Sequence, residues 1–169
     1  SGASFPSIGT DYWYMGNAQP KLLLGWNNNI RYKNFDLNFF LRGTFGHKIF
    51  NATRADLSYV TAAGVNNLIK TAVDDKVADI KNSFYSNRYI ESGSYVRMDN
   101  ATLAYTFNKV AKGISSLRFY VTGNNLFTIT DYSGIDPEIN QGGIAPGIDY
   151  NNFYPKTRTI MLGVNLTLQ

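Results

Sequence analysis

Few residues in this 169-residue sequence have side chains that could carry out catalysis. The single histidine, His47, lies in the stretch GTFGHKIFN, and no partner at metal-ligand spacing surrounds it. This context predicts a solvent-exposed turn residue. The sequence also contains no nucleophile elbow, P-loop or HExxH motif. An enzyme is therefore the weakest of the functional hypotheses, and we expect no catalytic residues.

Two pairs of acidic residues could bind a cation: Asp74 with Asp75, and Asp136 with Glu138. The second pair lies in DYSGIDPE, which lacks the alternating oxygen ligands and the final Glu of an EF-hand calcium loop. The dipeptide Asp136-Pro137 is more simply a turn. Because the chain also has no cysteine, the sequence predicts no metal site, no disulfide and no cofactor.

The candidate binding residues lie in stretches rich in Tyr, Asn, Asp and Gly. Such a composition binds sugars and peptides through ring stacking and adaptable hydrogen bonds. The alternative is that the aromatic side chains, Phe153 among them, only pack their loop down. The candidate contact residues are Tyr132, Asp136, Glu138, Asp149, Tyr150 and Tyr154.

Five segments that flank these stretches alternate apolar and polar residues with the period of a β-strand. In the last of them, every second residue from Ile160 to Leu168 is aliphatic. The alternation changes phase midway through the third segment, so a β-bulge is expected near Asp99-Asn100. The expected strands are Leu22–Tyr32, Phe35–Phe45 and residues 95–107, 117–127 and 158–168.

Short and long connections alternate between the expected strands. Lys33-Asn34 and residues 108–115 are short, whereas residues 46–94 and 128–156 form long connections. Ordinary domains seldom contain unstructured loops longer than about 15 residues, but outer-membrane barrels combine short periplasmic turns with long extracellular loops. In the first long connection, apolar residues at helical spacing predict a short amphipathic helix over residues 66–81.

The strand lengths fit a membrane barrel. A strand such as Leu22–Tyr32 covers about 36 Å at ~3.3 Å per residue. Tilted by ~45°, it spans about 25 Å, the height of the apolar band of such barrels. We therefore expect the aliphatic row from Ile160 to Leu168 to face lipid.

Five strands are nevertheless fewer than the eight of the smallest membrane barrels, and lipid does not tolerate open sheet edges. The sequence is thus expected to be the C-terminal piece of a larger barrel. The alternative is a free-standing soluble β-sheet module that binds a glycan.

The net charge of +4 comes from Lys and Arg residues that are scattered singly along the chain. Without a basic cluster or a recognition helix, we expect no nucleic-acid partner. No run of about 18 apolar residues predicts a transmembrane helix. The first residues, SGASFPSIGT, lack the charged and apolar regions of a signal peptide.

Two blocks, RMDNATLAYTF and NNLFTITDYSGIDPE, together resemble SusC-like, TonB-linked outer-membrane transporters. The resemblance extends in order over residues 16–51, 86–109 and 114–138 and over the ending YPKTRTIMLGVNLTLQ. Members of that family commonly end in an aromatic residue, whereas this sequence ends in Leu168-Gln169.

The resemblance implies an all-β fold: about five antiparallel up-and-down strands that form the last part of a large 22-stranded transmembrane β-barrel, with long extracellular loops. Residues 1–169 would be the C-terminal part of a TonB-dependent receptor barrel, without its plug or TonB box. The implied partners are the rest of the barrel, the lipid bilayer, a SusD-like lipoprotein lid, and TonB acting through the plug. The implied function is the import of an oligosaccharide or peptide across the cell outer membrane, and the candidate loop residues would contact the substrate or the lid.

The barrel hypothesis also predicts an orientation. With the C-terminus in the periplasm, residues 51–94 and 128–156 are extracellular, and Lys33-Asn34 and residues 108–115 are periplasmic. The unpaired sheet edges and the uncovered apolar face predict that the chain alone does not form a stable water-soluble monomer.

Overall fold

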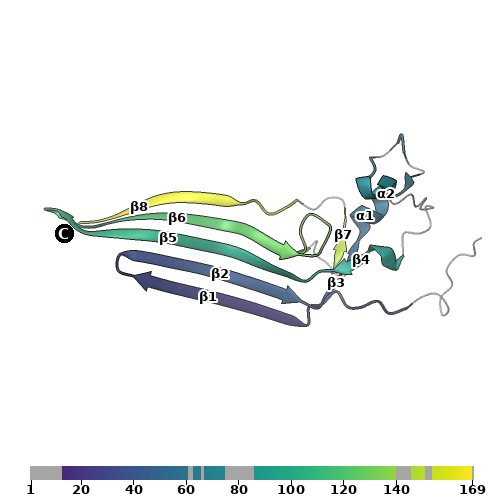
Figure 1. Cartoon of the computed structure of the whole chain (residues 1–169), viewed down its shortest axis with the longest axis horizontal. Coiled ribbons are helices and arrows are strands. Elements are labelled where there is room, and N and C mark those ends of the chain that lie inside the picture. The colour runs from purple at the N-terminus through teal and green to yellow at the C-terminus, as the bar shows by residue number, and fades with distance from the viewer. Residues whose placement is uncertain are drawn as a thin grey trace, which may run out of the picture. The chain divides into compact units, whose positions relative to one another are not determined.

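The computed structural model describes residues 13–60, 63–65, 67–74, 86–139, 146–150 and 154–168. Their contacts divide the chain into two compact units, whose elements are labelled in Figure 1. The first, called the loop unit, comprises Ser1–Pro20, Gly46–Gly93 and Tyr132–Tyr154. The second, called the sheet unit, comprises Lys21–Phe45, Ser94–Asp131 and Pro155–Gln169.

The sheet unit is a five-stranded antiparallel sheet with the order β1-β2-β5-β6-β8. Within this sheet, the order of the strands in space is the same as their order along the chain, so the sheet is an up-and-down meander (Figure 1). The strands are β1 (Leu22–Tyr32), β2 (Phe35–Phe45), β5 (Tyr95–Ala111), β6 (Ile114–Thr130) and β8 (Thr159–Leu168).

The predicted strands are confirmed, but two of them are longer than predicted. β5 continues past residue 107 to Ala111, and β6 runs from Ile114 to Thr130 instead of residues 117–127. The turn between them is therefore only Lys112-Gly113 and not residues 108–115. Alternation fails to predict the end of β5 because its pairing with β6 is irregular between Asn108 and Ala111.

The predicted β-bulge is also confirmed. Phe40 of β2 pairs with Asn100, and the next residue, Leu41, pairs with Met98, so Asp99 is the extra residue. The pairing of β5 with β6 shifts at the same place. The extra residue changes the phase of β5, so the apolar residues before and after it face the same side of the sheet.

The loop unit contains strands and a helix that the alternation pattern does not predict. Its three-stranded sheet has the order β4-β3-β7 and joins the two long connections, because β3 pairs antiparallel with β4 and parallel with β7. The elements of this unit are β3 (Lys48–Asn51), α1 (Ala52–Leu57), α2 (Lys70–Asp74), the 3-10 helix η2 (Asn87–Tyr89), β4 (Ile90–Ser92) and β7 (Ile148–Asp149).

The helices of the loop unit are short. α1 begins after Asn51, whose side chain caps it by accepting a hydrogen bond of 2.8 Å from the backbone N–H of Arg54. Of the helix predicted over residues 66–81, only α2 is described; residue 66 and residues 75–81 lie outside the described residues. In the described part of the chain, no helix is long and apolar enough to cross a membrane.

The loop unit has a small core of its own. Ile49 of β3, Ala55 of α1 and Tyr89 of η2 are almost completely buried. Tyr89 is the largest of these side chains, and its burial stabilises the unit by removing apolar ring surface from water. The described parts of the two long connections therefore pack around a shared core and are not extended coils.

Candidate functional site

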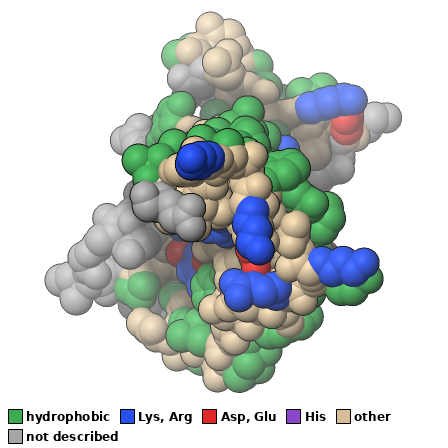
Figure 2. All heavy atoms as spheres, turned by 90° about the vertical axis from the view of Figure 1, so that its left-hand side faces the viewer, with side chains coloured by type: hydrophobic (Ala, Val, Ile, Leu, Met, Phe, Trp, Pro, Cys, Tyr) green, Lys and Arg blue, Asp and Glu red, His purple; other side chains and the backbone are tan. Residues whose placement is uncertain are grey.

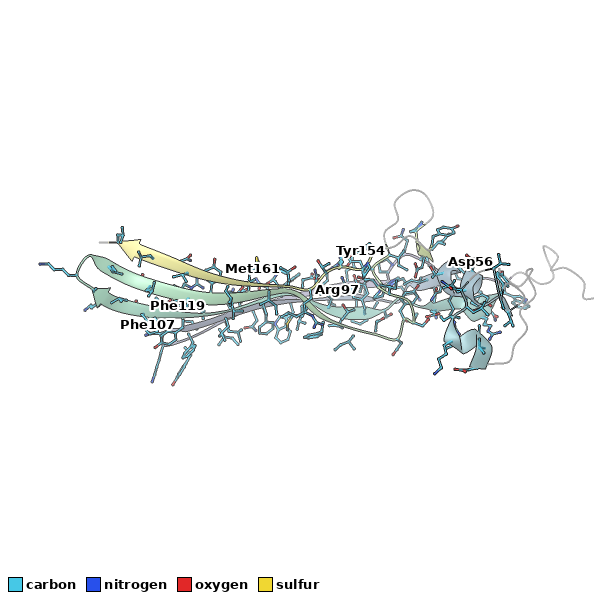
Figure 3. All side chains as sticks on the ribbon, turned by 90° about the horizontal axis from the view of Figure 1, so that it is seen from above. Asp56, Arg97, Phe107, Phe119, Tyr154 and Met161 are labelled. Atoms are coloured by element: carbon cyan, nitrogen blue, oxygen red, sulfur yellow. The ribbon has the colours of Figure 1, made fainter. Side chains whose placement is uncertain are left out.

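The sheet unit has two chemically different faces. Directly paired residues share a face of a sheet, so the register assigns each side chain to one side. Phe107 and Phe119 project from one side of the sheet, with ring centroids 6.0 Å apart, and Met161 projects from the other (Figure 3). The apolar face carries Leu22, Leu24, Trp26, Ile30, Tyr32, Phe35, Leu37, Leu103, Phe107, Phe119, Val121, Ile160, Leu162, Val164, Leu166 and Leu168.

The apolar face is uncovered within the described residues. Leu162 is 82% exposed, and Leu168, Ile160 and Trp26 are each more than half exposed. Monomeric soluble proteins rarely leave so large a contiguous apolar surface in water. Such a face fits contact with lipid, as predicted from the alternation of residues 160–168.

The opposite face, called the polar face, carries rows of hydrogen-bonding side chains. Asn38 donates a hydrogen bond of 2.5 Å to the side chain of Asn29. On the same row, the hydroxyl groups of Thr102 and Thr122 are 2.8 Å apart. These pairs satisfy polar groups within the sheet while leaving the face wettable, as the interior of a membrane barrel requires.

An ion-pair cluster lies at the bulge. Arg42 binds the carboxylate of Asp99 with both Nε and Nη2, at 2.9 and 3.2 Å, and its Nη1 is 3.3 Å from the hydroxyl of Tyr95. The guanidinium groups of Arg42 and Arg97 lie over the Tyr95 ring at 5.9 and 5.5 Å. The residue inserted by the bulge thus supplies the carboxylate that neutralises one of two neighbouring arginines.

Figure 2 views the molecule from the end where the turns of the sheet lie. Lys and Arg side chains (blue) gather around an acidic one (red), and hydrophobic side chains (green) lie outside them. The strands of the polar face supply four arginines, Arg31, Arg42, Arg97 and Arg118, against the acids Asp36 and Asp99. Four positive charges and two negative charges leave this face at +2.

In the loop unit, Glu91 of β4 joins residues from both long connections. Its carboxylate accepts hydrogen bonds from the backbone N–H and hydroxyl of Ser133, at 2.8 and 2.7 Å. It also accepts from Arg54 Nη1 at 3.1 Å and from Asn51 Nδ2 at 3.2 Å. Burial opposes ionisation of Glu91, but these donors outweigh burial, and the pKa of Glu91 is lowered.

A second acid of the loop unit, Asp149 of β7, also accepts hydrogen bonds from residues of both long connections. The Tyr132 hydroxyl donates a hydrogen bond of 2.5 Å to Asp149 Oδ2, and the Thr53 hydroxyl lies 3.2 Å from the Asp149 carbonyl oxygen. Burial and the neighbouring Asp149 carboxylate raise the pKa of Tyr132, so its hydroxyl keeps its proton and remains a donor.

Of the six candidate contact residues, three are buried, two are exposed and one, Glu138, is half-buried. Tyr132, Asp136 and Asp149 are buried, so these three side chains hold the loop unit together. Asp136 caps a turn by accepting a hydrogen bond of 2.8 Å from the backbone N–H of Glu138. Tyr150 and Tyr154 are 53% and 80% exposed, so these two present aromatic rings to whatever lies outside the loop unit.

The prediction for His47 is wrong: this residue is buried and is not an exposed turn residue. Its backbone carbonyl accepts a hydrogen bond of 3.0 Å from the N–H of Gly93. Burial lowers the pKa of its imidazole, although a hydrogen bond to the backbone of Pro137 opposes this shift. His47 is therefore neutral at pH 7 and belongs to the packing of the loop unit.

Metal-ligating side chains do not converge within the described residues: no group of three or more His, Cys, Asp or Glu side chains could hold an ion there. The acids that do lie near one another each have nitrogen or hydroxyl donors as neighbours, as Glu91 and Asp149 show. The arrangement can hold loops in place and present aromatic rings.

Comparison with solved structures agrees with this architecture. Over 97% of its length, the chain superposes on 19% of a chain of the RagAB peptide transporter with a TM-score of 0.75 and 21% identity. With the RagAB peptide importer in its closed-closed state, the TM-score is 0.72 and the identity is 19%; the match again covers 97% of this chain and 19% of the importer chain. The fold and its two-faced sheet therefore match a segment of these transporter chains.

Sequence comparison identifies the class of barrel, although no family model matches the chain. TonB-dependent receptor P3 of Formosa agariphila is 33% identical over 168 residues, which cover 90% of this chain and 17% of the receptor. TonB-dependent receptor SusC of Bacteroides thetaiotaomicron is 32% identical over 155 residues, which cover 86% of this chain and 15% of SusC. Over most of its own length the chain is thus similar to a segment of TonB-dependent receptors, SusC among them, and it spans only about a sixth of the length of these relatives.

Proposed function

We propose that residues 1–169 form the C-terminal part of the barrel wall and two surface loops of a TonB-dependent importer that takes up nutrients through the outer membrane. The observation that carries this proposal is the pair of opposite faces on one sheet, aliphatic on one side and polar on the other. The similar proteins are named as receptors and importers, and none of those compared is named as an enzyme.

The finer proposal concerns the substrate and the partners. The structural neighbour is described as a peptide importer, and the resemblance of the sequence to SusC-like transporters implies a glycan or a peptide, so an oligosaccharide or a peptide is the proposed substrate. A SusD-like lipoprotein is the proposed lid over the barrel, and TonB the proposed source of energy through the plug. The free-standing glycan-binding module is the weaker candidate, because it leaves the apolar face without a function.

The orientation of the barrel gives a direct test. Cysteines introduced by Val65→Cys in the loop unit and by Lys112→Cys in the β5–β6 turn report opposite sides of the membrane. Val65 is 88% exposed, so a cysteine at this position can react with the reagent without any change in the folded structure. We expect an impermeant maleimide to label the first variant on intact cells and the second only after the outer membrane is permeabilised. Labelling of the turn, but not of the loop, on intact cells would contradict the proposed topology.

Contact with substrate or lid is proposed for the exposed aromatic residues. Replacing Tyr154 by Ala removes an exposed ring that no other described residue covers, so the folded receptor should keep its stability. We expect the affinity for substrate or for the copurified lid to fall about 2- to 13-fold, since a contact with one aromatic ring contributes roughly 0.5–1.5 kcal/mol.

The matched control is Tyr14→Ala, since Tyr14 is 85% exposed and belongs to the same unit. Equal affinities of the two variants and the wild type, measured on the purified receptor, would remove Tyr154 from the proposed contact surface.

A further inference from the structure

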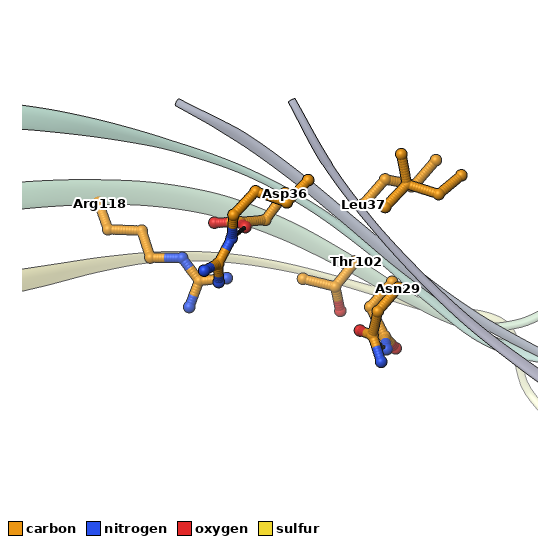
Figure 4. A pocket seen from close by; sticks show the side chains of 8 residues that line it. Asn29, Asp36, Leu37, Thr102 and Arg118 are labelled. Carbon is orange, nitrogen blue, oxygen red and sulfur yellow. Dashed lines mark hydrogen bonds and ion pairs between the residues drawn. The ribbon is translucent and has the colours of Figure 1, made fainter. Parts of the chain in front are cut away.

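A pocket of about 290 Å³ lies on the polar face of the sheet unit. Figure 4 shows the guanidinium of Arg118 on the same side of the strands as Asp36, Thr102 and Asn29, with Leu37 on the opposite side. The lining comes from β1, β2, β5 and β6, so the pocket lies within one regular sheet. Ile30 and Leu37 contribute to the lining, and its polar groups are amide, hydroxyl and guanidinium groups together with a single carboxylate.

Of the two arginines that line this pocket, only Arg31 forms an ion pair within the described residues. Arg31 Nε lies 2.5 Å from Asp36 Oδ1, so those two charges neutralise each other. Arg118 makes no ion pair with any residue that the structure describes, and its Nε atom is buried without a hydrogen-bond partner there. Two guanidinium groups and one carboxylate leave the pocket with a net charge of +1.

The two strands beside β6 do not place a charged partner next to Arg118, and Asp36, the carboxylate of the pocket, is paired with Arg31. β6 lies between β5 and β8, so both lateral neighbours of Arg118 belong to this chain. They are Thr106 on β5 and Asn165 on β8, and neither carries a charge. Strands added at the outer edges of β1 and β8 would lie farther away. A counter-charge for Arg118 must therefore approach from above the polar face.

The chemistry of the pocket selects the kind of group that would bind. A guanidinium presents parallel N–H donors that match a carboxylate or a phosphate. The Asp36 carboxylate repels a second negative charge, so a phosphate dianion is disfavoured. A single negative charge neutralises the net +1, and Thr102 and the Asn29–Asn38 pair border the space.

We propose that the Arg118 pocket binds a carboxylate that enters from the interior of the barrel. This inference rests on the proposed function, because it takes the polar face to line that interior. The carboxylate has two possible sources: an Asp or Glu side chain of the same receptor outside residues 1–169, or a free acidic ligand. Both sources present the same planar anion to Arg118.

Zero-length crosslinking in the complete receptor tests the inference. Arg118→Lys keeps the charge and adds an amine that carbodiimide joins only to a carboxylate in contact with it. Arg31→Lys is the positive control, since its amine should be linked to Asp36. Arg118→Gln is the negative control, because it keeps a polar side chain but has no amine. Mass spectrometry of tryptic peptides then identifies the linked carboxylate.

The second measurement detects a free carboxylate. Phenylglyoxal modifies exposed arginines of the wild-type receptor, and sodium acetate is compared with sodium chloride at equal ionic strength. We expect acetate to slow the modification of Arg118 severalfold if a free anion binds there. Arg158, which is exposed and lies outside the pocket, is the reference whose rate should not change.

A link from the Arg118→Lys variant to a receptor peptide outside residues 1–169 supports the proposal and identifies a carboxylate of the receptor itself, whereas a link to Asp36 alone counts against it. Protection by acetate without such a link supports the free ligand. Absence of both, in a preparation where the Arg31→Lys control is linked to Asp36, overturns the proposal. Transport can fail while the link still forms, so this inference and the proposed import function are decided separately.

Discussion

Replacing Leu162 by Lys should destabilise the folded receptor by about 2–4 kcal/mol, the cost of a lysine on the lipid face near the middle of the membrane. Leu162 is 82% exposed on the apolar face, so the loss does not come from a cavity in a protein core. The cost arises because lipid cannot solvate the ammonium group. The row to which Leu162 belongs is apolar on all five strands: Ile30, Leu37, Leu103, Val121 and Leu162.

The neighbouring residue provides the matched control. Met161 is also apolar but points to the polar face, where it pairs with Thr122. Met161→Lys should therefore cost little, because its ammonium group enters a wet interior. The measurement is urea-induced unfolding of both variants of the receptor, refolded into phospholipid vesicles. Similar losses at residues 161 and 162 would indicate a sheet buried on both sides by protein. A loss confined to Met161→Lys would reverse the assignment of the faces.

The sheet was predictable from the sequence because its two sides meet different solvents. Contact with lipid on one side and with water on the other forces apolar and polar residues to alternate, and alternation is visible in a single sequence. The same logic located the bulge, since an apolar series that changes phase at Asp99-Asn100 needs one extra residue to keep facing lipid. The tip of β5 is not predictable from alternation because its pairing with β6 is irregular between Asn108 and Ala111.

The loop unit was not predictable, because its strands are too short to show any period. β7 consists of Ile148–Asp149, and its pairing with β3 joins segments that lie far apart in the sequence. The groups that donate hydrogen bonds to Glu91 belong to Asn51, Arg54 and Ser133. These residues form no local sequence motif with Glu91 that would predict the contacts. The burial of His47 is not predictable for the same reason, since it depends on contacts outside its own turn.

The candidate contact residues follow from local composition alone. Composition does not distinguish an aromatic ring that binds a ligand from one that packs a loop. Only the structure separates buried Tyr132 from exposed Tyr154. The arginines of the polar face were missed as a group because each stands alone in the sequence. Counting charges on the polar side of the predicted strands would have found Arg42 and Arg118, whose positions follow from alternation alone.

Replacing Glu91 by Gln should loosen the loop unit by about 1–3 kcal/mol, the usual cost of leaving buried hydrogen-bonding groups without their partner. Gln has the same shape but replaces one acceptor oxygen by an NH₂ group. That group would face the donors of Ser133, Arg54 or Asn51, and the Arg54 guanidinium would lose its counter-charge. Hydrogen exchange of the amides of β3 and β4 in the intact receptor is the measurement, and 1.4 kcal/mol corresponds to about tenfold faster exchange.

The control for Glu91→Gln is Asp74→Asn, which removes an exposed carboxylate from the same unit and should leave exchange unchanged. The effect of pH provides a second check. The pKa of Glu91 lies below its ordinary value of 4.5 in the folded unit, so its ionised form stabilises the fold fully above that pH. This stabilisation is lost as the pH falls through the folded-state pKa, and Gln at this position does not titrate. The wild type and Glu91→Gln should therefore converge in acid; a difference that persists unchanged below that pKa would mean that the charge of Glu91 does not hold the two loops together.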